Sequence, residues 1–389
     1  MIGNQFLEVP LEEKTNGGTN MFKTDPVIFA VNNTYHIMIP VTKPSILYVK
    51  IGKKYYYDES NGIKRSEVSI HRVIVPKDEL DKAMEYTVSE QVIIDRKPYF
   101  PETEKPVEMR FEFQPVKGKN VCAYHISDTH SYDEAAIRAA KTFGHFDFLI
   151  LNGDIPNHSG TVENMETIYK IAATLTKGRI PTVFARGNHD LRGIYAESFE
   201  QYTPADNGKT YYTFRLGGIW GLILDCGEDK NDSNPEYGSM VCCHEFRIKE
   251  TEFINKVIAN AENEYLADGV THRIVVVHNP FTCKYEPPFN IEEDIYSEWA
   301  RLLKENIKPD LMICGHKHTL EINEPGCECD ALGQPCTVVV GATIKCGDQN
   351  NETYFAGTGF KFSDSSIEVT FTDSEGKILG KKDIAICGN

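Results

Sequence analysis

Five short clusters of Asp, His and Asn interrupt apolar runs in the second part of the chain. Such groups are costly to bury unless they are paired or bind a metal ion. Each cluster follows a run that predicts a strand, and in open α/β sheets ligands bind beyond the carboxyl ends of strands. Carboxylate oxygens, an amide oxygen and imidazoles, without thiolates, suit Mn²⁺, Fe, Zn²⁺ or Ni²⁺. The clusters are Asp128-Thr129-His130, Gly153-Asp154, Gly187-Asn188-His189-Asp190, His278 and Gly315-His316-Lys317-His318.

Each cluster also has an ordinary structural explanation when it is considered alone. Asp128 is suited to cap the following helix, and His278 fits a hydrogen-bonded histidine of the core. Asn188 fits a left-handed turn residue beside a glycine. The choice between these explanations and a metal site therefore depends on the clusters taken together.

Two of the clusters contain residue pairs with the same spacing. Asp128 and His130 form an i, i+2 pair that leaves a strand, and so do His316 and His318. Side chains two residues apart in a strand lie on the same face, so both members of each pair can project to one side. This shared geometry favours a common metal site.

The motifs D-x-H, G-D, G-N-H-D, H and G-H-x-H, in this order, resemble the five motifs of the calcineurin-like metallophosphoesterases. The resemblance covers residues 119–389 and implies an α/β fold, a four-layer βαββ-sandwich. Residues 20–115 resemble the β-sandwich domain that precedes the catalytic domain of purple acid phosphatases. We therefore expect a small all-β sandwich domain over residues 1–115 and a metallophosphoesterase domain over residues 119–389.

The resemblance implies a centre with two metal ions, with Mn²⁺ expected and Fe, Zn²⁺ or Ni²⁺ as alternatives. A hydroxide bridging the two ions would attack phosphorus in line. The implied ligands of one ion are Asp128, His130 and His318, those of the other are Asn188, His278 and His316, and Asp154 bridges them.

Four further residues are candidates for catalysis or substrate binding. His189 would protonate the leaving oxygen or stabilise charge on the phosphoryl group. Asp190 would either orient His189 or begin the next helix. His158 and Arg192 are weaker candidates for contact with the substrate phosphate, because His158 is more simply explained as an exposed loop histidine and Arg192 as a partner in a surface ion pair.

The chain departs from several branches of the family. Asn157 occupies the position, three residues after Asp154, at which purple acid phosphatases carry a tyrosine, so we do not expect an Fe(III)–tyrosinate centre. The segment GDIPNHSG lacks the Asp-Arg-Gly of protein Ser/Thr phosphatases. Nucleases that act at DNA double-strand breaks share D-x-H, but the net charge of −16 argues against nucleic acid as a partner.

We therefore predict a hydrolase of phosphoric esters, a phosphatase or a phosphodiesterase, whose partner is a small phosphorylated substrate. A nuclease or cyclic-nucleotide phosphodiesterase with the same metal centre is the first alternative. A non-catalytic metal-binding scaffold or adhesion protein with a vestigial site is the second. The intact ligand set argues against the second alternative, because a vestigial site would be expected to have lost ligands.

The elements that must position these residues can be read from the pattern of apolar residues. Residues 27–113 read mainly as strands, with a helical pattern only at 77–82. From residue 121 strands alternate with helices, which predicts a layered α/β domain. The helices are expected at 132–143, 163–177, 193–202, 246–266 and 291–306.

Composition agrees with a globular protein that does not enter a membrane. Apolar residues make up 41 % of the 389 residues, and no apolar run approaches the length of a membrane helix. The N-terminus shows no secretory signal pattern. An odd number of cysteines, 11, reads better as reduced thiols than as a disulfide framework, so we expect a cytoplasmic location.

Overall fold

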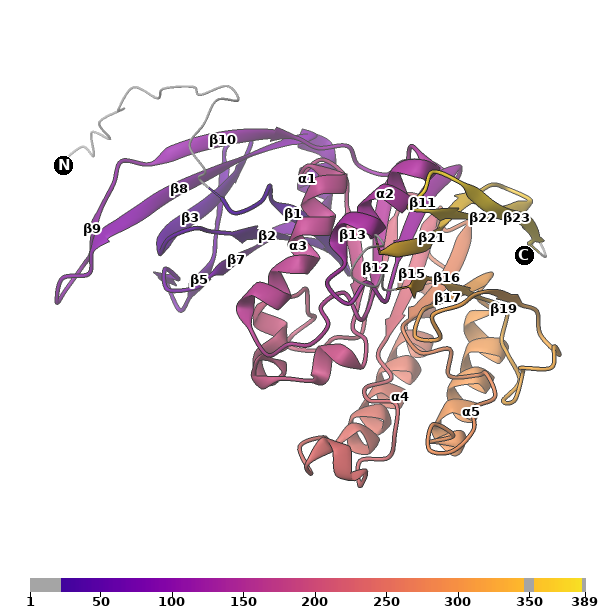
Figure 1. The fold of residues 1–389 in the computed structure, drawn as a ribbon. Coiled ribbons are helices and arrows are strands. Elements are labelled where there is room, and N and C mark those ends of the chain that lie inside the picture. Colours follow the sequence, from indigo (N-terminus) through magenta and orange to yellow (C-terminus); the bar gives the residue numbers. More distant parts are fainter. Residues whose placement is uncertain (1–21, 346–352, 387–389) are drawn as a thin grey trace.

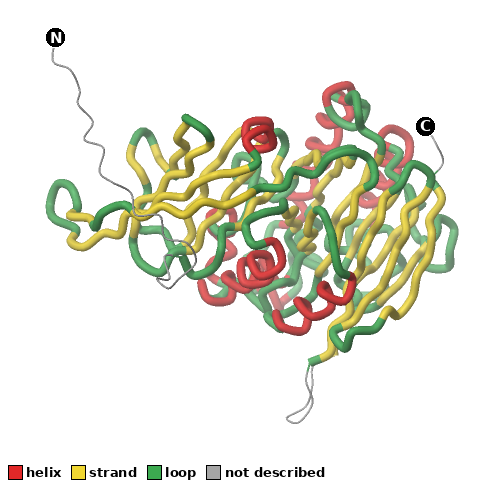
Figure 2. The backbone as a smooth tube through the Cα atoms, turned by 90° about the horizontal axis from the view of Figure 1, so that it is seen from above, coloured by secondary structure: helices red, strands yellow, loops and turns green. Residues whose placement is uncertain are grey.

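The computed structural model describes residues 22–345 and 353–386, and its strands dominate the architecture. The molecule is elongated, with the N-terminal strands at one end and the C-terminal strands at the other (Figures 1 and 2). None of the helices in the described ranges combines the length and the apolar character needed to cross a membrane.

The larger sheet has ten strands, and three parallel strands at its middle carry predicted site clusters. β11, β12 and β13 run parallel, and β21 joins β11 in the antiparallel sense. Nine strands follow one another across the sheet, and β20 (Thr343–Lys345) pairs with β21. Their order is β23 (Ile378–Ala385), β22 (Ser366–Asp373), β21 (Tyr354–Phe362), β11 (Val121–Ile126), β12 (Phe148–Asn152), β13 (Thr182–Ala185), β1 (Val27–Val31), β2 (Thr34–Pro40) and β7 (Ile70–Pro76).

The second sheet has six strands and packs face to face on the first. β15, β16, β17 and β19 run parallel, whereas β14 and β18 pair in the antiparallel sense at the two edges. Ile150 of the first sheet and Ile274 of the second belong to one buried cluster between the sheets. The order is β14 (Tyr212–Leu216), β15 (Ile219–Leu224), β16 (His272–Val277), β17 (Leu311–Cys314), β19 (Thr337–Gly341) and β18 (Leu320–Asn323).

Helices cover the outer face of each sheet. α2 (Asp133–Phe143) and α3 (Val162–Thr176) bury their apolar faces against the ten-stranded sheet. α4 (Cys243–Ala259) and α5 (Glu293–Leu302) do the same on the six-stranded sheet. The α/β class and the four layers are therefore confirmed, and the layers run in the order helix, sheet, sheet, helix.

The N-terminal strands form a two-layer sandwich that shares a sheet with the rest of the molecule. Its first layer is β1, β2 and β7, which continue the ten-stranded sheet because Phe29 of β1 pairs with Thr182 of β13. The second layer is a five-stranded sheet, and a short helix, α1 (Lys77–Ala83), buries Leu80 in the shared core. The five strands are β10 (Val107–Glu112), β8 (Glu85–Asp95), β3 (Ser45–Ile51), β4 (Lys54–Tyr57) and β9 (Glu102–Thr103), and a separate hairpin joins β5 (Glu59–Ser60) to β6 (Ile63–Lys64).

The boundary between residues 115 and 119 remains a prediction, since the ten-stranded sheet runs through both parts of the chain. Residues 1–21, 346–352 and 387–389, which the two predicted domains include, lie outside the described residues.

The predicted helix at 246–266 differs from the observed one. α4 ends at Ala259, and a 3₁₀ turn at Ala261–Asn263 follows. The amide of Asn263 donates to Asn260 Oδ1 over 2.7 Å. Asn side chains compete with the backbone for hydrogen bonds and so favour turns, which explains the early end.

Candidate metal centre

The five predicted clusters lie at the carboxyl ends of five strands of two sheets that face each other. β11, β12 and β13 carry the first three clusters, and β16 and β17 carry the last two. Within each sheet these strands run parallel, so their carboxyl ends form one edge. Hydrogen bonds and ion pairs across the gap between the sheets bring the clusters into contact.

Sharp turns of the backbone aim these side chains into the gap. Five site residues that are not glycine have positive φ: Asp128 (55°), His130 (45°), Asp154 (52°), His316 (69°) and His318 (53°). Such residues favour negative φ, so the surrounding structure must hold them there. The two i, i+2 pairs therefore project from turns beyond the strands, not from the strands themselves.

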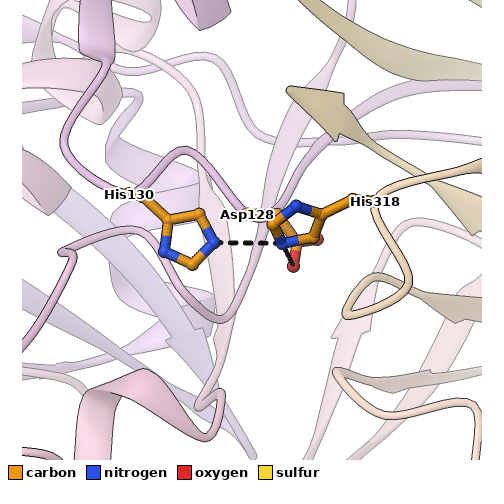
Figure 3. A group of neighbouring side chains, drawn as sticks. All are labelled: Asp128, His130 and His318. Atoms are coloured by element: carbon orange, nitrogen blue, oxygen red, sulfur yellow. Dashed lines mark hydrogen bonds and ion pairs between the residues drawn. The ribbon is translucent and has the colours of Figure 1, made fainter. Parts of the chain in front are cut away.

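Asp128, His130 and His318 form one group of potential metal ligands (Figure 3). Nε2 of His318 lies 3.3 Å from Asp128 Oδ1 and 3.1 Å from His130 Nε2. One oxygen or nitrogen from each residue lies within 4.8 Å of the other two. This is the set that the sequence predicts for one metal ion.

The remaining predicted ligands lie next to this group. Asp154 Oδ2 is 3.2 Å from His278 Nε2, and Asp128 Oδ1 is 3.8 Å from the same nitrogen. His316 Nδ1 lies 3.0 Å from Asn188 Oδ1, and the rings of His278 and His316 are 5.5 Å apart. All seven predicted ligands therefore meet at one place, and their roles as ligands remain a prediction.

The buried carboxylates give this place a negative potential. Burial alone would lower the pKa of His278. The carboxylates of Asp154 and Asp128 outweigh this effect and raise the pKa to about 10. Burial raises the pKa of Asp154, yet the neighbouring histidines, His278 foremost, bring it below its ordinary value. Burial lowers the pKa of His130 and of His316 to about 4 each, which favours the neutral imidazole that coordinates metals.

Buried imidazole nitrogens indicate that the site fits a cation. His130 Nδ1 is buried and makes no hydrogen bond among the described residues, and the buried His278 Nε2 faces the carboxylates of Asp154 and Asp128. His278 Nδ1 lies 2.7 Å from the carbonyl oxygen of Asn152, which only accepts, so the proton belongs on Nδ1. Nε2 then faces the two carboxylates, and a metal ion bound there would take the place of the second proton that their charge favours.

His189 lies at the edge of the cluster, beside a cation. Its ring is 4.6 Å from that of His130, and its backbone N–H donates to Asp154 Oδ1 over 2.8 Å. His189 Nδ1 is 2.9 Å from the carbonyl oxygen of Asn157, and Nε2 is 3.0 Å from Arg192 Nη1. His189 is thus held by its neighbours on both ring nitrogens.

Asp190 is fully buried, and its carboxylate accepts from the Gly187 N–H over 2.7 Å. Burial raises the pKa of Asp190 to about 8, and the nearby Asp154 adds to the shift. The contact places Asp190 in support of the turn that carries Asn188 and His189, whereas the His189 ring is held by Asn157 and Arg192. Its predicted catalytic role stays a prediction.

The two candidates for substrate contact lie in different surroundings. Arg192 makes a two-pronged ion pair with Glu228, in which both N···O distances are 2.9 Å. His158 is exposed, and its ring contacts the side-chain amide of Asn164 and the N–H of Gly160. Of the two, Arg192 is the one that contacts another predicted site residue, His189.

Sequence reasoning missed three supporting residues. The Asn152 amide donates to the carbonyl oxygens of Val277 (3.3 Å) and Ile313 (3.1 Å) and so ties the two sheets together. The Ser127 hydroxyl donates to Asp128 Oδ2 over 2.6 Å. The position of Asn152 at the end of a buried apolar strand could have identified it from the sequence. Glu228, the third residue, pairs with Arg192, and no sequence pattern near Glu228 indicates this pairing.

Comparisons with known proteins match a family model to the chain and find a similar fold in a solved structure. The family model of the calcineurin-like phosphoesterases matches residues 123–320. A purple acid phosphatase from yellow lupin (Lupinus luteus) seeds aligns over 92 % of this chain and 74 % of its own, at 13 % identity and a TM-score of 0.57. A dimetal phosphatase from Danio rerio aligns over 70 % of this chain and 99 % of its own, at 11 % identity and a TM-score of 0.46. The search of curated proteins finds no match.

Proposed function

This chain belongs to the calcineurin-like phosphoesterase family, and from that membership we propose that it hydrolyses a small phosphomonoester or phosphodiester at the centre described above. As a member of the family it is a metal-dependent hydrolase of phosphoric esters. The observation that carries the proposal is the convergence of carboxylates and imidazoles from five strand ends on one buried place.

The ligands divide between two metal ions in the proposal. The first ion is assigned to Asp128, His130 and His318, and the second to Asn188, His278 and His316, with Asp154 between them. When bound, two such ions would supply a Lewis acid for the phosphoryl group and a hydroxide from water at neutral pH. Mn²⁺ is the proposed metal, since oxygen and imidazole donors suit it.

His189 is the proposed proton donor to the leaving oxygen. Its Nδ1 donates to the Asn157 carbonyl, so Nε2, which here accepts from Arg192, is the nitrogen that would exchange a proton with the leaving oxygen once Arg192 turns to the phosphoryl group. Arg192 lies 3.0 Å from that nitrogen and would neutralise charge on the phosphoryl oxygens. Its own pairing with Glu228 limits the positive charge at the entrance, which disfavours a nucleic-acid substrate.

The test begins with protein stripped of metal by a chelator and reloaded with Mn²⁺. Hydrolysis of p-nitrophenyl phosphate and of bis-p-nitrophenyl phosphate is then measured side by side. We expect turnover of at least one ester that depends on metal, and the preferred ester distinguishes a phosphatase from a phosphodiesterase. Failure of the reloaded protein to hydrolyse either ester would contradict the proposal.

The variant Asp154→Asn removes one carboxylate charge from the centre. We expect less bound metal per chain and loss of hydrolysis, because Asp154 faces His278 and the His189 N–H. Asp364→Asn is the matched control, since it makes the same change on a side chain that is 70 % exposed. Metal content is measured by mass spectrometry of the native protein. Unchanged metal content in Asp154→Asn would remove Asp154 from the ligand set.

A further inference from the structure

A cavity of about 750 Å³ lies beside the candidate metal centre. Arg192 is part of its lining and also contacts the centre, because its Nη1 is 3.0 Å from His189 Nε2. Glu228, which pairs with Arg192, is a second lining residue near this junction. A substrate whose phosphate lies at the metal centre would therefore have Arg192, which lines this cavity, close to its ester oxygens.

The outer walls of the cavity are apolar. Ile194 follows the Gly187–Asp190 cluster and is 72 % exposed, and Met240 comes from a separate loop and is 73 % exposed. Phe246, at the start of α4, supplies an aromatic wall. Exposed apolar side chains that gather at a cavity, from segments far apart in sequence, are typical of a binding site for apolar groups.

The charged lining residues do not favour a second anionic group. Arg186 and Arg192 are the cations of the lining that the structure describes, and both are paired with carboxylates. Arg186 contacts the buried Asp225 over 2.7 Å, and Arg192 is held by Glu228. The lining also includes Glu197 and Glu236, so its carboxylates outnumber its guanidinium groups. An uncharged apolar group fits this lining better than a second phosphate or a carboxylate.

We propose that this cavity binds the organic part of the substrate, and that the substrate is a phosphate ester of an apolar alcohol or phenol. The inference rests on the proposed function, because the metal centre must hold the phosphate. The phosphoryl group then lies between the clustered ligands and the His189–Arg192 pair, and an alkyl chain or aromatic ring extends past Arg192 to Ile194 and Met240. The volume suits a group of several carbon atoms.

The experiment measures binding of two phosphonates that are not hydrolysed. Methylphosphonate and hexylphosphonate are titrated separately into the Mn²⁺-loaded protein by calorimetry. Each methylene that leaves water should improve affinity roughly threefold to fourfold, so hexylphosphonate should bind at least tenfold more tightly even if only part of the chain is buried.

Two variants test whether the higher affinity for hexylphosphonate arises in the cavity. Met240→Ser and Ile194→Ser should each reduce the preference for hexylphosphonate severalfold, while affinity for methylphosphonate stays as in the parent protein. Ile63→Ser is the matched control, because Ile63 is 68 % exposed on the separate β5–β6 hairpin. Circular dichroism of each variant establishes that it is folded.

Equal affinity for the two phosphonates, or an undiminished preference in both cavity variants, would overturn the assignment, as would the absence of binding by either phosphonate. Hydrolysis of the p-nitrophenyl esters is recorded on the same samples. If the p-nitrophenyl esters are hydrolysed but the two phosphonates bind equally, the cavity assignment alone is wrong. If neither ester is hydrolysed and neither phosphonate binds, the proposed function is wrong as well.

Discussion

At the scale of single residues, the site combines chemical and conformational demands on the same positions. Asp128, His130, Asp154, His316 and His318 are predicted metal ligands, and all five have left-handed backbone conformations. Asp and His tolerate such conformations better than β-branched residues do, but at some cost in stability. Replacing one of them by glycine would remove a ligand and relieve the backbone at once, so amide or alanine variants separate the two effects better.

His189→Ala tests the proton-donor role apart from metal binding. We expect turnover to fall by about 10²- to 10⁴-fold while the metal content stays unchanged, because His189 is not among the proposed ligands. The fall should be larger for an ester with a poor leaving group than for a p-nitrophenyl ester, since p-nitrophenolate leaves without protonation.

His145→Ala is the control for that change. His145 is 76 % exposed and precedes β12, so it lies at the opposite end of the strand from Asp154. A loss of turnover that is equal for good and poor leaving groups would show that His189 does not donate the proton.

At the scale of elements, the sequence predicts the strands far better than it predicts their partners. Apolar runs that precede Asp154 and His278 identify β12 and β16 and place these two residues just beyond their carboxyl ends. The pairing of β1 with β13 has no comparable signal, because it joins Phe29 to Thr182 across most of the first half of the chain. Sheet order depends on such distant contacts, whereas strand formation depends on local pattern.

The clusters were predictable for the same reason, because polar residues that end buried strands stand out in a sequence. The structure brings all seven predicted ligands together, and the division of these ligands between two metal ions comes from the family resemblance. The sequence does not predict the contact between His189 and Arg192 or the ion pair between Arg192 and Glu228. Glu228 lies in a loop after β15, and no sequence pattern relates it to Arg192. Contacts between loops depend on the finished fold.

Glu90 in β8 provides a test of stability at this scale. It is 2 % exposed, and burial raises its pKa to about 7. The folded state therefore holds a proton that the unfolded chain releases near its ordinary pKa, and stability falls as the pH rises through 7. Glu90→Gln mimics the protonated form and should stabilise the protein by about 1 kcal/mol at pH 8, allowing for solvent screening, and by much less at pH 5.

Thermal unfolding at the two pH values measures the effect of Glu90→Gln. Glu85→Gln is the control in the same strand, because the Glu85 side chain is 46 % exposed and should change stability little at either pH. A gain in Glu90→Gln that is equal at pH 5 and pH 8 would exclude ionisation of Glu90 as its cause.

At the scale of the whole molecule, the continuous ten-stranded sheet predicts that the two parts of the chain depend on each other. Removal of residues 1–115 would take away β1 and leave the edge of β13 without its partner. Bare edges of long sheets promote aggregation. We therefore expect the shortened chain to be insoluble under conditions in which the full chain is soluble, as judged by size-exclusion chromatography. A soluble, monodisperse fragment with metal-dependent turnover would show that the sandwich is dispensable.

The same sheet sets the order in which the protein can fold as it is synthesised. β1 and β2 leave the ribosome first, yet β1 meets β13 only after Thr182 has emerged, and β11 waits for β21, which pairs Val121 with Phe362. Contacts so distant in sequence form slowly and leave apolar strands uncovered in the meantime. We therefore expect compact structure to form late in synthesis, after the last third of the chain has been made.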